Sequence, residues 1–245
     1  MKKKALYMSM RKLFYLLTDS RCFLCQKPLV FDNILNTSLC KKCFENLTTE
    51  KSEFFCLKCG KKMNTNGICE ECCDNSENIY YDSYKYIQSY SGASAQLVKL
   101  HKQYDNHKVL DLYVSLLCKI LNPDYPVCIV PDSFLGILKK GKCCFSVEIS
   151  KKLRKKGFCV ISGIIKKSSF AKMQKLLNNK DRQSNANKIF NLNKNPPIIK
   201  TTLGTIQLVD DIFTTGSTIN RCSKLLKDFG FKKVLAYSLF KAKFR

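Results

Sequence analysis

Four Cys-x2-Cys pairs in the first third of the chain constrain its folding more than any other feature. The pairs form two sets, with fourteen residues between the pairs of the first set and nine between those of the second. A Cys-x2-Cys pair on a tight turn aims both sulfurs at one point, and two such turns supply the corners of a tetrahedral zinc site. The spacing therefore predicts two structural zinc ribbons, with these ligands: Cys22, Cys25, Cys40 and Cys43, then Cys56, Cys59, Cys69 and Cys72.

We predict that each set binds its own metal ion, although a crossed sharing of the same ligands stays open. Disulfides are the alternative, but they need an oxidising compartment, and such close pairs brace a domain poorly. A secretory signal is not expected, because Arg11 and Lys12 interrupt the apolar stretch that follows the lysines after Met1. We therefore predict a cytoplasmic protein without a membrane span, in which residues 1–20 form an amphipathic segment.

The net charge narrows the class of partner. The chain has 43 basic and 19 acidic residues, a formal charge of +24, and such an excess attracts polyanions such as nucleic acid. Lysine, however, occurs together with abundant Asn, Ile and Phe, a mixture that an AT-rich genome also produces. The charge alone is therefore weak evidence for a nucleic-acid partner, and the 45% of apolar residues indicates a packed core.

Strand and helix patterns alternate after residue 79, where cysteines become sparse. Apolar runs predict strands at 127–130, 159–165, 204–209 and 233–240, and helical spacing predicts helices over 142–156 and 217–229. This alternation is typical of an α/β fold with a parallel sheet flanked by helices. We predict a zinc-ribbon module over residues 21–75 and an α/β domain over residues 79–245.

Residues 206–218 carry the pattern with the clearest chemistry. An apolar strand leads to Asp210 and Asp211, and open α/β sheets bind ligands at the carboxyl ends of their strands. Adjacent carboxylates accept hydrogen bonds from vicinal sugar hydroxyls. The turn that follows can hold a phosphate at a helix N-terminus, where free N–H groups and the helix dipole favour anions. The turn consists of Thr214, Thr215, Gly216, Ser217 and Thr218.

This run resembles the signature of type I phosphoribosyltransferases. In that family the acids contact the ribose of phosphoribosyl pyrophosphate, and the turn binds its 5′-phosphate. Together with a double zinc ribbon, the signature is similar to the competence protein F (ComF) family, a phosphoribosyltransferase-like group linked to DNA uptake. The resemblance covers nearly the whole chain from Cys22 to Lys241 and implies a type I phosphoribosyltransferase-like sheet.

A second block of residues agrees with that family. Five residues keep both the identity and the spacing of a family segment that lies beside the active site: Gln174, Leu177, Arg182, Asn185 and Phe190. The resemblance implies that Gln174, Arg182 and Asn185 contact pyrophosphate or substrate. A solvated linker is the alternative for the same stretch.

A third block departs from the family pattern. The family's two-proline pyrophosphate loop retains only Pro131 here, and Lys140 and Gly141 are what remains of the basic segment after it. Lys140 still offers a positive charge to pyrophosphate. Cys143 and Cys144 replace polar residues and cannot reproduce their hydrogen bonds, which leaves it open whether the chain transfers a phosphoribosyl group.

The resemblance implies a reaction in which pyrophosphate leaves ribose C1, with Mg²⁺ bridging ribose hydroxyls and pyrophosphate oxygens and with Asp210 and Asp211 as the catalytic acids. The sequence offers no general base, since His101 and His107 fit surface or packing positions better.

The first functional hypothesis is thus a phosphoribosyl pyrophosphate-binding protein in DNA uptake. An adaptor that binds single-stranded DNA or a DNA-uptake helicase is the second, and a nucleotide-salvage phosphoribosyltransferase is the third.

Overall fold

The computed structural model describes residues 21–29, 39–48, 54–65, 67–104, 107–132, 144–167, 189–198 and 203–242. Contacts divide the chain into two units: Met1–Glu50 with Ser91–Leu112, and Lys51–Tyr90 with Tyr113–Arg245. The second cysteine set is therefore grouped with the sheet, whereas the predicted domain boundary at residue 75 separates them. Within the described ranges, no helix combines the length and the apolar character that crossing a membrane requires.

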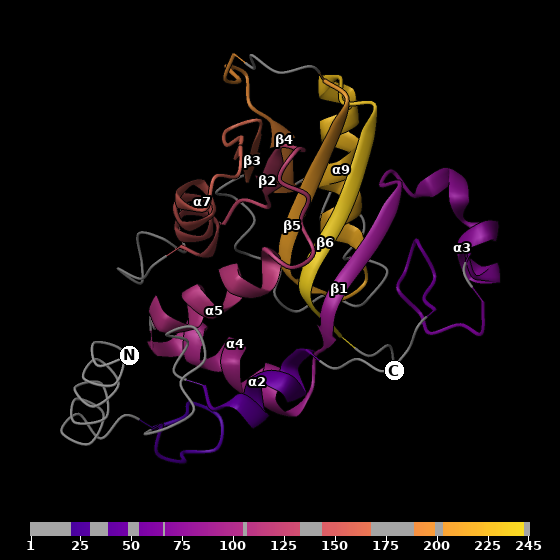
Figure 1. The fold of residues 1–245 in the computed structure, drawn as a ribbon. Helices are drawn as coiled ribbons and strands as arrows, with labels where there is room; N and C mark the ends of the chain where they lie inside the picture. Colours follow the sequence, from indigo (N-terminus) through magenta and orange to yellow (C-terminus); the bar gives the residue numbers. More distant parts are fainter. Residues whose placement is uncertain are drawn as a thin grey trace. The chain divides into compact units, whose positions relative to one another are not determined.

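The larger unit is built on a four-stranded parallel sheet, and this confirms the predicted α/β class. Its strands follow the order β1-β6-β5-β2 (Figure 1). In that order the strands are β1 (Ser83–Ser89), β6 (Lys233–Lys241), β5 (Thr205–Phe213) and β2 (Val127–Ile129). The central strands β5 and β6 are buried along most of their length, as expected for a parallel sheet covered on both faces.

Helix α9 (Ser217–Phe229) packs against β5 and β6 (Figure 1). Its other buried apolar residues, Ile219, Leu225 and Leu226, lie three or four positions from buried Cys222, so the four form one apolar stripe. Gly230 ends the helix, and both bounds agree with the sequence prediction.

The sheet also packs against rings from α5 (His107–Leu117) and α7 (Phe145–Lys155). The Tyr113 ring lies 5.8 Å from that of Phe240 on β6 and 6.2 Å from that of Phe145. Helix α7 contacts β2. These contacts form a second apolar layer within the larger unit.

Two strands differ from the sequence prediction. The apolar run at 159–165 pairs with β2 only at Val160, because Gly163, with φ of 87°, redirects the chain. The next strand, β3 (Ile165–Lys167), pairs antiparallel with β4 (Phe190–Leu192) in a separate sheet. Strand β5 also continues past Val209 to Phe213, since its backbone pairing with β6 does not stop at the acids.

The smaller unit contains α2 (Lys41–Thr48), α4 (Gly92–Tyr104) and the first part of α5. Helix α2 contacts α4. Leu39, Phe44, Leu47 and Leu97 are buried. Two short helices, α3 (Glu70–Asp74) and the 3-10 helix η1 (Ser76–Asn78), belong to the larger unit and follow the second cysteine set.

Candidate functional site

Each cysteine set begins with a tight turn of the same build. The Gln26 N–H donates to the Cys22 carbonyl at 2.9 Å, and the Gly60 N–H donates to the Cys56 carbonyl at 2.8 Å. The residue after the second cysteine is left-handed in both turns, with φ of 59° at Gln26 and 68° at Gly60. The first pair of each set therefore lies on the kind of turn that the spacing predicts.

The second pair of each set lies at the start of a helix instead of on a second turn. Cys40 immediately precedes α2, and Cys69 is the N-cap residue of α3. Cys43 and Cys72 follow in the first helical turn, where residues three apart lie on one face. The sulfurs still converge, and the helix N-terminus favours a thiolate.

The sulfurs of each set fit a zinc ion. All four lie within 4.8 Å of one another, in the sequential grouping. Cys25 Sγ lies 3.7 Å from Cys40 Sγ, and Cys59 Sγ lies 3.7 Å from Cys69 Sγ. Sulfurs about 2.3 Å from a central zinc stand about 3.8 Å apart at the corners of a tetrahedron. A disulfide needs about 2.05 Å between sulfurs, so the geometry favours metal.

The electrostatics of the second set also favour a bound cation. Burial raises the pKa of the Cys56 thiol, but hydrogen bonds from the backbone N–H groups of Cys69, Cys59 and Lys58 lower it to about 6. Burial and the charge of Cys56 raise the pKa of Cys59 to about 11. Four thiolates at this separation repel one another, and a bound zinc ion removes that cost.

The two acids of the predicted sugar site lie on β5. Both are half-buried, and Asp210 pairs in register with Ser238 of β6. The Asp210 carboxylate accepts from the Asp211 N–H at 2.8 Å, and the Asp211 carboxylate accepts from the Ile212 N–H at 2.7 Å. Burial raises the pKa of Asp210 well above its usual value, and repulsion from Asp211 adds to the effect. Such a pair favours a nearby cation or a hydrogen-bond donor.

The turn after β5 exposes Thr214 and Thr215 and then begins α9. Gly216 is the N-cap residue, with a left-handed φ of 77°. As a glycine it has no side chain that could cap the helix. The Thr215 and Ser217 hydroxyls lie 2.8 Å apart. The first N–H groups of a helix have no intrahelical acceptor. The hydroxyls and these N–H groups together provide the donors that a phosphate needs.

Gly216 is also required by the packing beneath the turn. A Cβ atom at this position would lie 2.7 Å from Cζ of Phe213. Phe213 cannot easily move away, because its buried ring stacks on that of Tyr84 with centroids 4.1 Å apart. The turn therefore approaches the ring more closely than any residue with a side chain allows.

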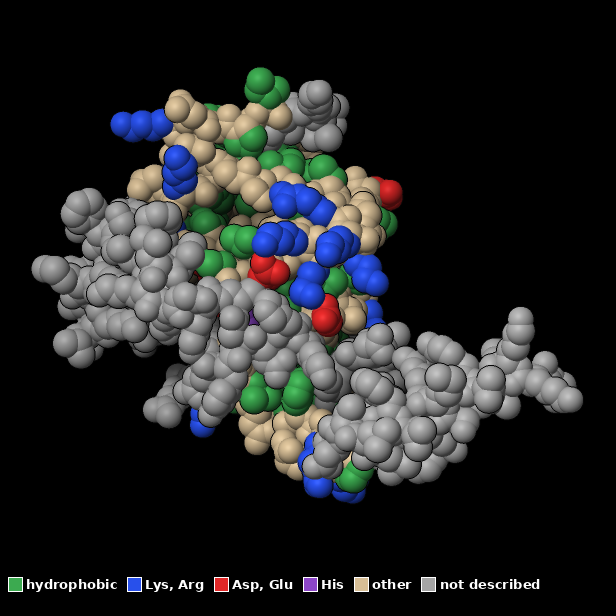
Figure 2. All heavy atoms as spheres, turned by 90° about the vertical axis from the view of Figure 1, so that its left-hand side faces the viewer, with side chains coloured by type: hydrophobic (Ala, Val, Ile, Leu, Met, Phe, Trp, Pro, Cys, Tyr) green, Lys and Arg blue, Asp and Glu red, His purple; other side chains and the backbone are tan. Residues whose placement is uncertain are grey.

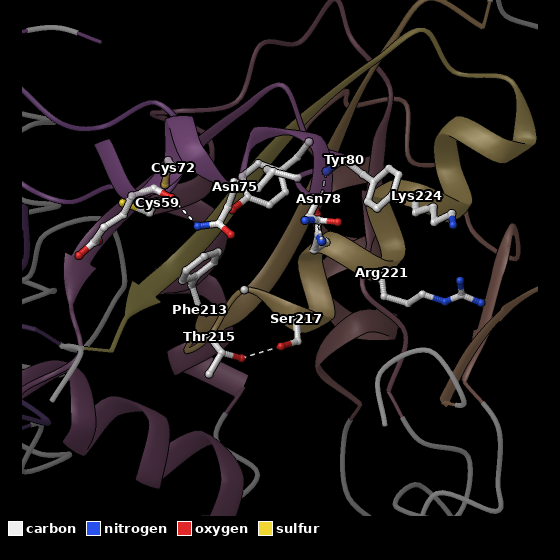
Figure 3. Close-up of a pocket in the computed structure, with 15 residues that line it drawn as sticks. Cys59, Cys72, Asn75, Asn78, Tyr80, Phe213, Thr215, Ser217, Arg221 and Lys224 are labelled. Carbon is white, nitrogen blue, oxygen red and sulfur yellow. Dashed lines mark hydrogen bonds between the residues drawn. The ribbon is translucent and has the colours of Figure 1, made fainter. Parts of the chain in front are cut away.

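A cavity of about 620 Å³ lies between this turn and the second cysteine set. Figure 3 shows Cys59 and Cys72 on one side of the cavity and Lys224 on the other. The Lys224 ammonium lies 5.1 Å from the centre of the Tyr80 ring. Sequence reasoning missed Lys224 and Tyr80 at this site, because no local pattern connects α9 with the cysteine turns.

Lys167, at the end of β3, is another residue that sequence reasoning missed. Its charge lowers the pKa of Asp210, so it partly offsets the effect of burial. The Lys167 ammonium also lies 5.1 Å from the centre of the Phe190 ring on β4. A lysine just before a lysine-rich stretch of sequence carries no distinguishing signal.

Comparison with known proteins agrees with the two cysteine sets and finds relatives of the chain. Residues 13–73 match the model of the double zinc ribbon domain. The chain is 25% identical over 241 residues to competence protein ComFC of Streptococcus pneumoniae, covering 89% of this chain and 99% of that protein. It is 34% identical over 84 residues to competence protein F of Haemophilus influenzae, covering 34% and 35% of the two chains.

The resemblance to the competence protein F family is confirmed. The residues implied by that resemblance are only partly described. Pro131 is half-buried and lines a separate cavity of about 300 Å³ with residues of α7. Beside it, the Asp132 carboxylate accepts from the Ser146 N–H at 2.7 Å and so caps α7. The other residues of the family's loops lie outside the described ranges: Lys140, Gln174, Arg182 and Asn185.

Metal analysis is expected to find two zinc ions per chain, and one after Cys56→Ser, because that change removes a ligand from the second set. Cys73→Ser is the matched control, since Cys73 is exposed and lies outside both four-sulfur groups. Mass spectrometry of the metal content measures both. Two zinc ions retained by Cys56→Ser would contradict the assignment.

Gly216→Ala is expected to destabilise the chain more than Gly157→Ala. Both positions have a left-handed φ, of 77° and 90°, which costs about 1–2 kcal/mol for an L-residue. A Cβ at Gly157 meets nothing within 4 Å, whereas one at Gly216 meets the Phe213 ring. Urea denaturation measures the difference, and equal losses would show that the ring does not constrain the turn.

Proposed function

We propose that the chain binds phosphoribosyl pyrophosphate at the carboxyl end of β5. One observation carries the proposal: two adjacent half-buried carboxylates are followed within one turn by a left-handed glycine that opens a helix N-terminus. The ligand requires the same two chemistries in the same order. Its ribose has vicinal hydroxyls that donate to carboxylates, and its 5′-phosphate accepts from backbone N–H groups.

The charges of the site suit this ligand when a divalent cation accompanies it. Mg²⁺ bound with the pyrophosphate neutralises phosphate oxygens and gives the carboxyl pair an opposite charge. Asp210 and Asp211 are the groups that face this ion and the ribose in our proposal. Lys167, whose charge acts on Asp210, supplies a positive group on the same side.

The proposal concerns binding and leaves phosphoribosyl transfer out. Pro131 is the only proline of the family's pyrophosphate loop that this chain keeps, and two cysteines, Cys143 and Cys144, replace polar residues after it. A thiol is a weak hydrogen-bond donor. The leaving pyrophosphate therefore has fewer strong donors here than the family pattern provides.

We place this binding in DNA uptake. The support is that both relatives are named competence proteins, one of them similar along nearly its full length. In this role the ligand acts as a signal of nucleotide supply, and the partners we propose are single-stranded DNA and a helicase of the uptake apparatus.

Asp210→Asn/Asp211→Asn is expected to weaken phosphoribosyl pyrophosphate binding at least tenfold in calorimetry with Mg²⁺, because hydrogen bonds to charged groups contribute about 1.5–3 kcal/mol. Asp228→Asn is the control, since Asp228 is exposed at the far end of α9. A wild-type chain that binds nothing at millimolar ligand would reject the proposed function.

The basic surface of α7 favours single-stranded DNA as a second ligand. Lys and Arg side chains gather on the side of the molecule where α7 lies (Figure 2). Four basic residues are exposed in the C-terminal half of α7 or just beyond it: Lys151, Arg154, Lys155 and Lys156. Such a cluster contacts phosphates without reading sequence, and its binding weakens steeply with salt.

Lys155→Glu/Lys156→Glu is expected to weaken binding of a thymidine oligonucleotide and to flatten its salt dependence by about 1.4 logarithmic units per decade, since each lost phosphate contact contributes about 0.7. Lys232→Glu/Lys233→Glu is the control, because it changes another exposed lysine pair by the same net charge. Fluorescence anisotropy across a salt series measures both. Equal losses in the two variants would indicate a general charge effect.

A further inference from the structure

The second cysteine turn is bonded directly to the edge of the sheet. The Tyr84 N–H on β1 donates to the Leu57 carbonyl at 2.6 Å, and the Lys58 ammonium donates to the Tyr81 carbonyl at 2.6 Å. The Phe55 ring meets the edge of the Tyr86 ring, with centroids 5.7 Å apart. The turn that presents Cys56 and Cys59 is therefore part of the sheet's packing.

Gly60 brings this turn against the tyrosines of β1. A Cβ atom at Gly60 would lie 2.8 Å from Cε1 of Tyr86 and 3.1 Å from Cε1 of Tyr84. The equivalent position in the first set is Gln26, which has the same backbone conformation and carries a full side chain. The glycine is thus needed for the ring contact, because the turn itself accommodates a larger residue.

The ring contact continues to the proposed phosphate-binding turn at residues 214–218, hereafter the phosphate turn. Tyr84 is buried, its hydroxyl lies 2.7 Å from Ser238 Oγ, and its ring stacks on Phe213 at 4.1 Å. Phe213 in turn fills the space where a side chain at Gly216 would stand. The second cysteine set is thereby connected with the N-terminus of α9 by four residues in continuous contact: Gly60, Tyr84, Phe213 and Gly216.

We propose that the second cysteine set, when it binds its metal, fixes the phosphate turn through Tyr84 and Phe213. These two are positioning residues, since they act on the ligand only through Gly216 and its neighbours. Metal occupancy of this set then determines how tightly the turn binds a phosphorylated ligand. The effect on ligand affinity rests on the function proposed above, whereas the effect on the turn does not.

The physical reason is preorganisation. Without metal the turn loses most of its folding free energy, so Gly60 no longer confines the rings of Tyr86 and Tyr84. Phe213 then gains room, and the N–H groups after Gly216 sample more orientations. A phosphate that must order its own donors binds more weakly than one that finds them in place.

Hydrogen exchange tests the coupling without any ligand. Cys72→Ser is expected to increase amide exchange at residues 213–218 at least fivefold relative to Cys43→Ser. Cys43→Ser is the matched reference, because it removes a sulfur from the first set and so also costs the chain one metal ion. Phe213→Leu is expected to raise exchange in the same segment while the chain keeps two zinc ions. Phe229→Leu is its control, because Phe229 stacks with Phe231 at the other end of α9.

Calorimetry with phosphoribosyl pyrophosphate and Mg²⁺ then tests the consequence. Cys72→Ser and Phe213→Leu are expected to bind about tenfold more weakly than Cys43→Ser and Phe229→Leu, respectively. Unchanged exchange at residues 213–218 in both Phe213→Leu and Cys72→Ser would overturn the coupling, even if the wild type binds the ligand. Increased exchange in a chain that binds no ligand would support the coupling and reject the proposed function.

Discussion

The contact between Phe213 and Tyr84 is the interaction on which both the second cysteine turn and the turn after β5 depend. Phe213 is the last residue of β5 and lies directly under the phosphate turn, while Tyr84 belongs to the edge strand that carries the cysteine turn. Their rings stack at 4.1 Å inside the core, and close packing leaves little freedom to move one without the other. The candidate metal site and the proposed anion site are therefore joined by one pair of side chains.

The sequence predicts most of the sheet, because buried parallel strands are continuous apolar runs with a strong local signal. Residues 206–209 and 233–240 show this clearly, and the periodicity and terminal glycine of α9 give its bounds. The end of β5 was predicted four residues early. Apolar character stops at Asp210, but backbone pairing with β6 continues to Phe213, and pairing between strands distant in sequence leaves no mark on a single segment.

The candidate site was predicted in its parts but not in its surroundings. The acids, the turn and the eight cysteines all follow from motifs with a known chemistry. The docking of the second cysteine turn on β1 does not, because Gly60 looks like any turn glycine until the Tyr86 ring is found against it. Lys167 and Lys224 were missed for the same reason, since each is one lysine among many until the fold brings it near the site.

The carboxyl pair couples the binding of the proposed ligand to the binding of its cation. Burial and mutual repulsion oppose two negative charges on Asp210 and Asp211, and Lys167 offsets this only in part. Phosphoribosyl pyrophosphate alone adds more negative charge to the same place, so it binds poorly without a cation. A cation alone lacks the oxygen ligands that the ribose and pyrophosphate supply. At the proposed site, ligand and Mg²⁺ should therefore bind together, each raising the affinity for the other, because the cation offsets the negative charges and the ligand supplies the cation's oxygen ligands.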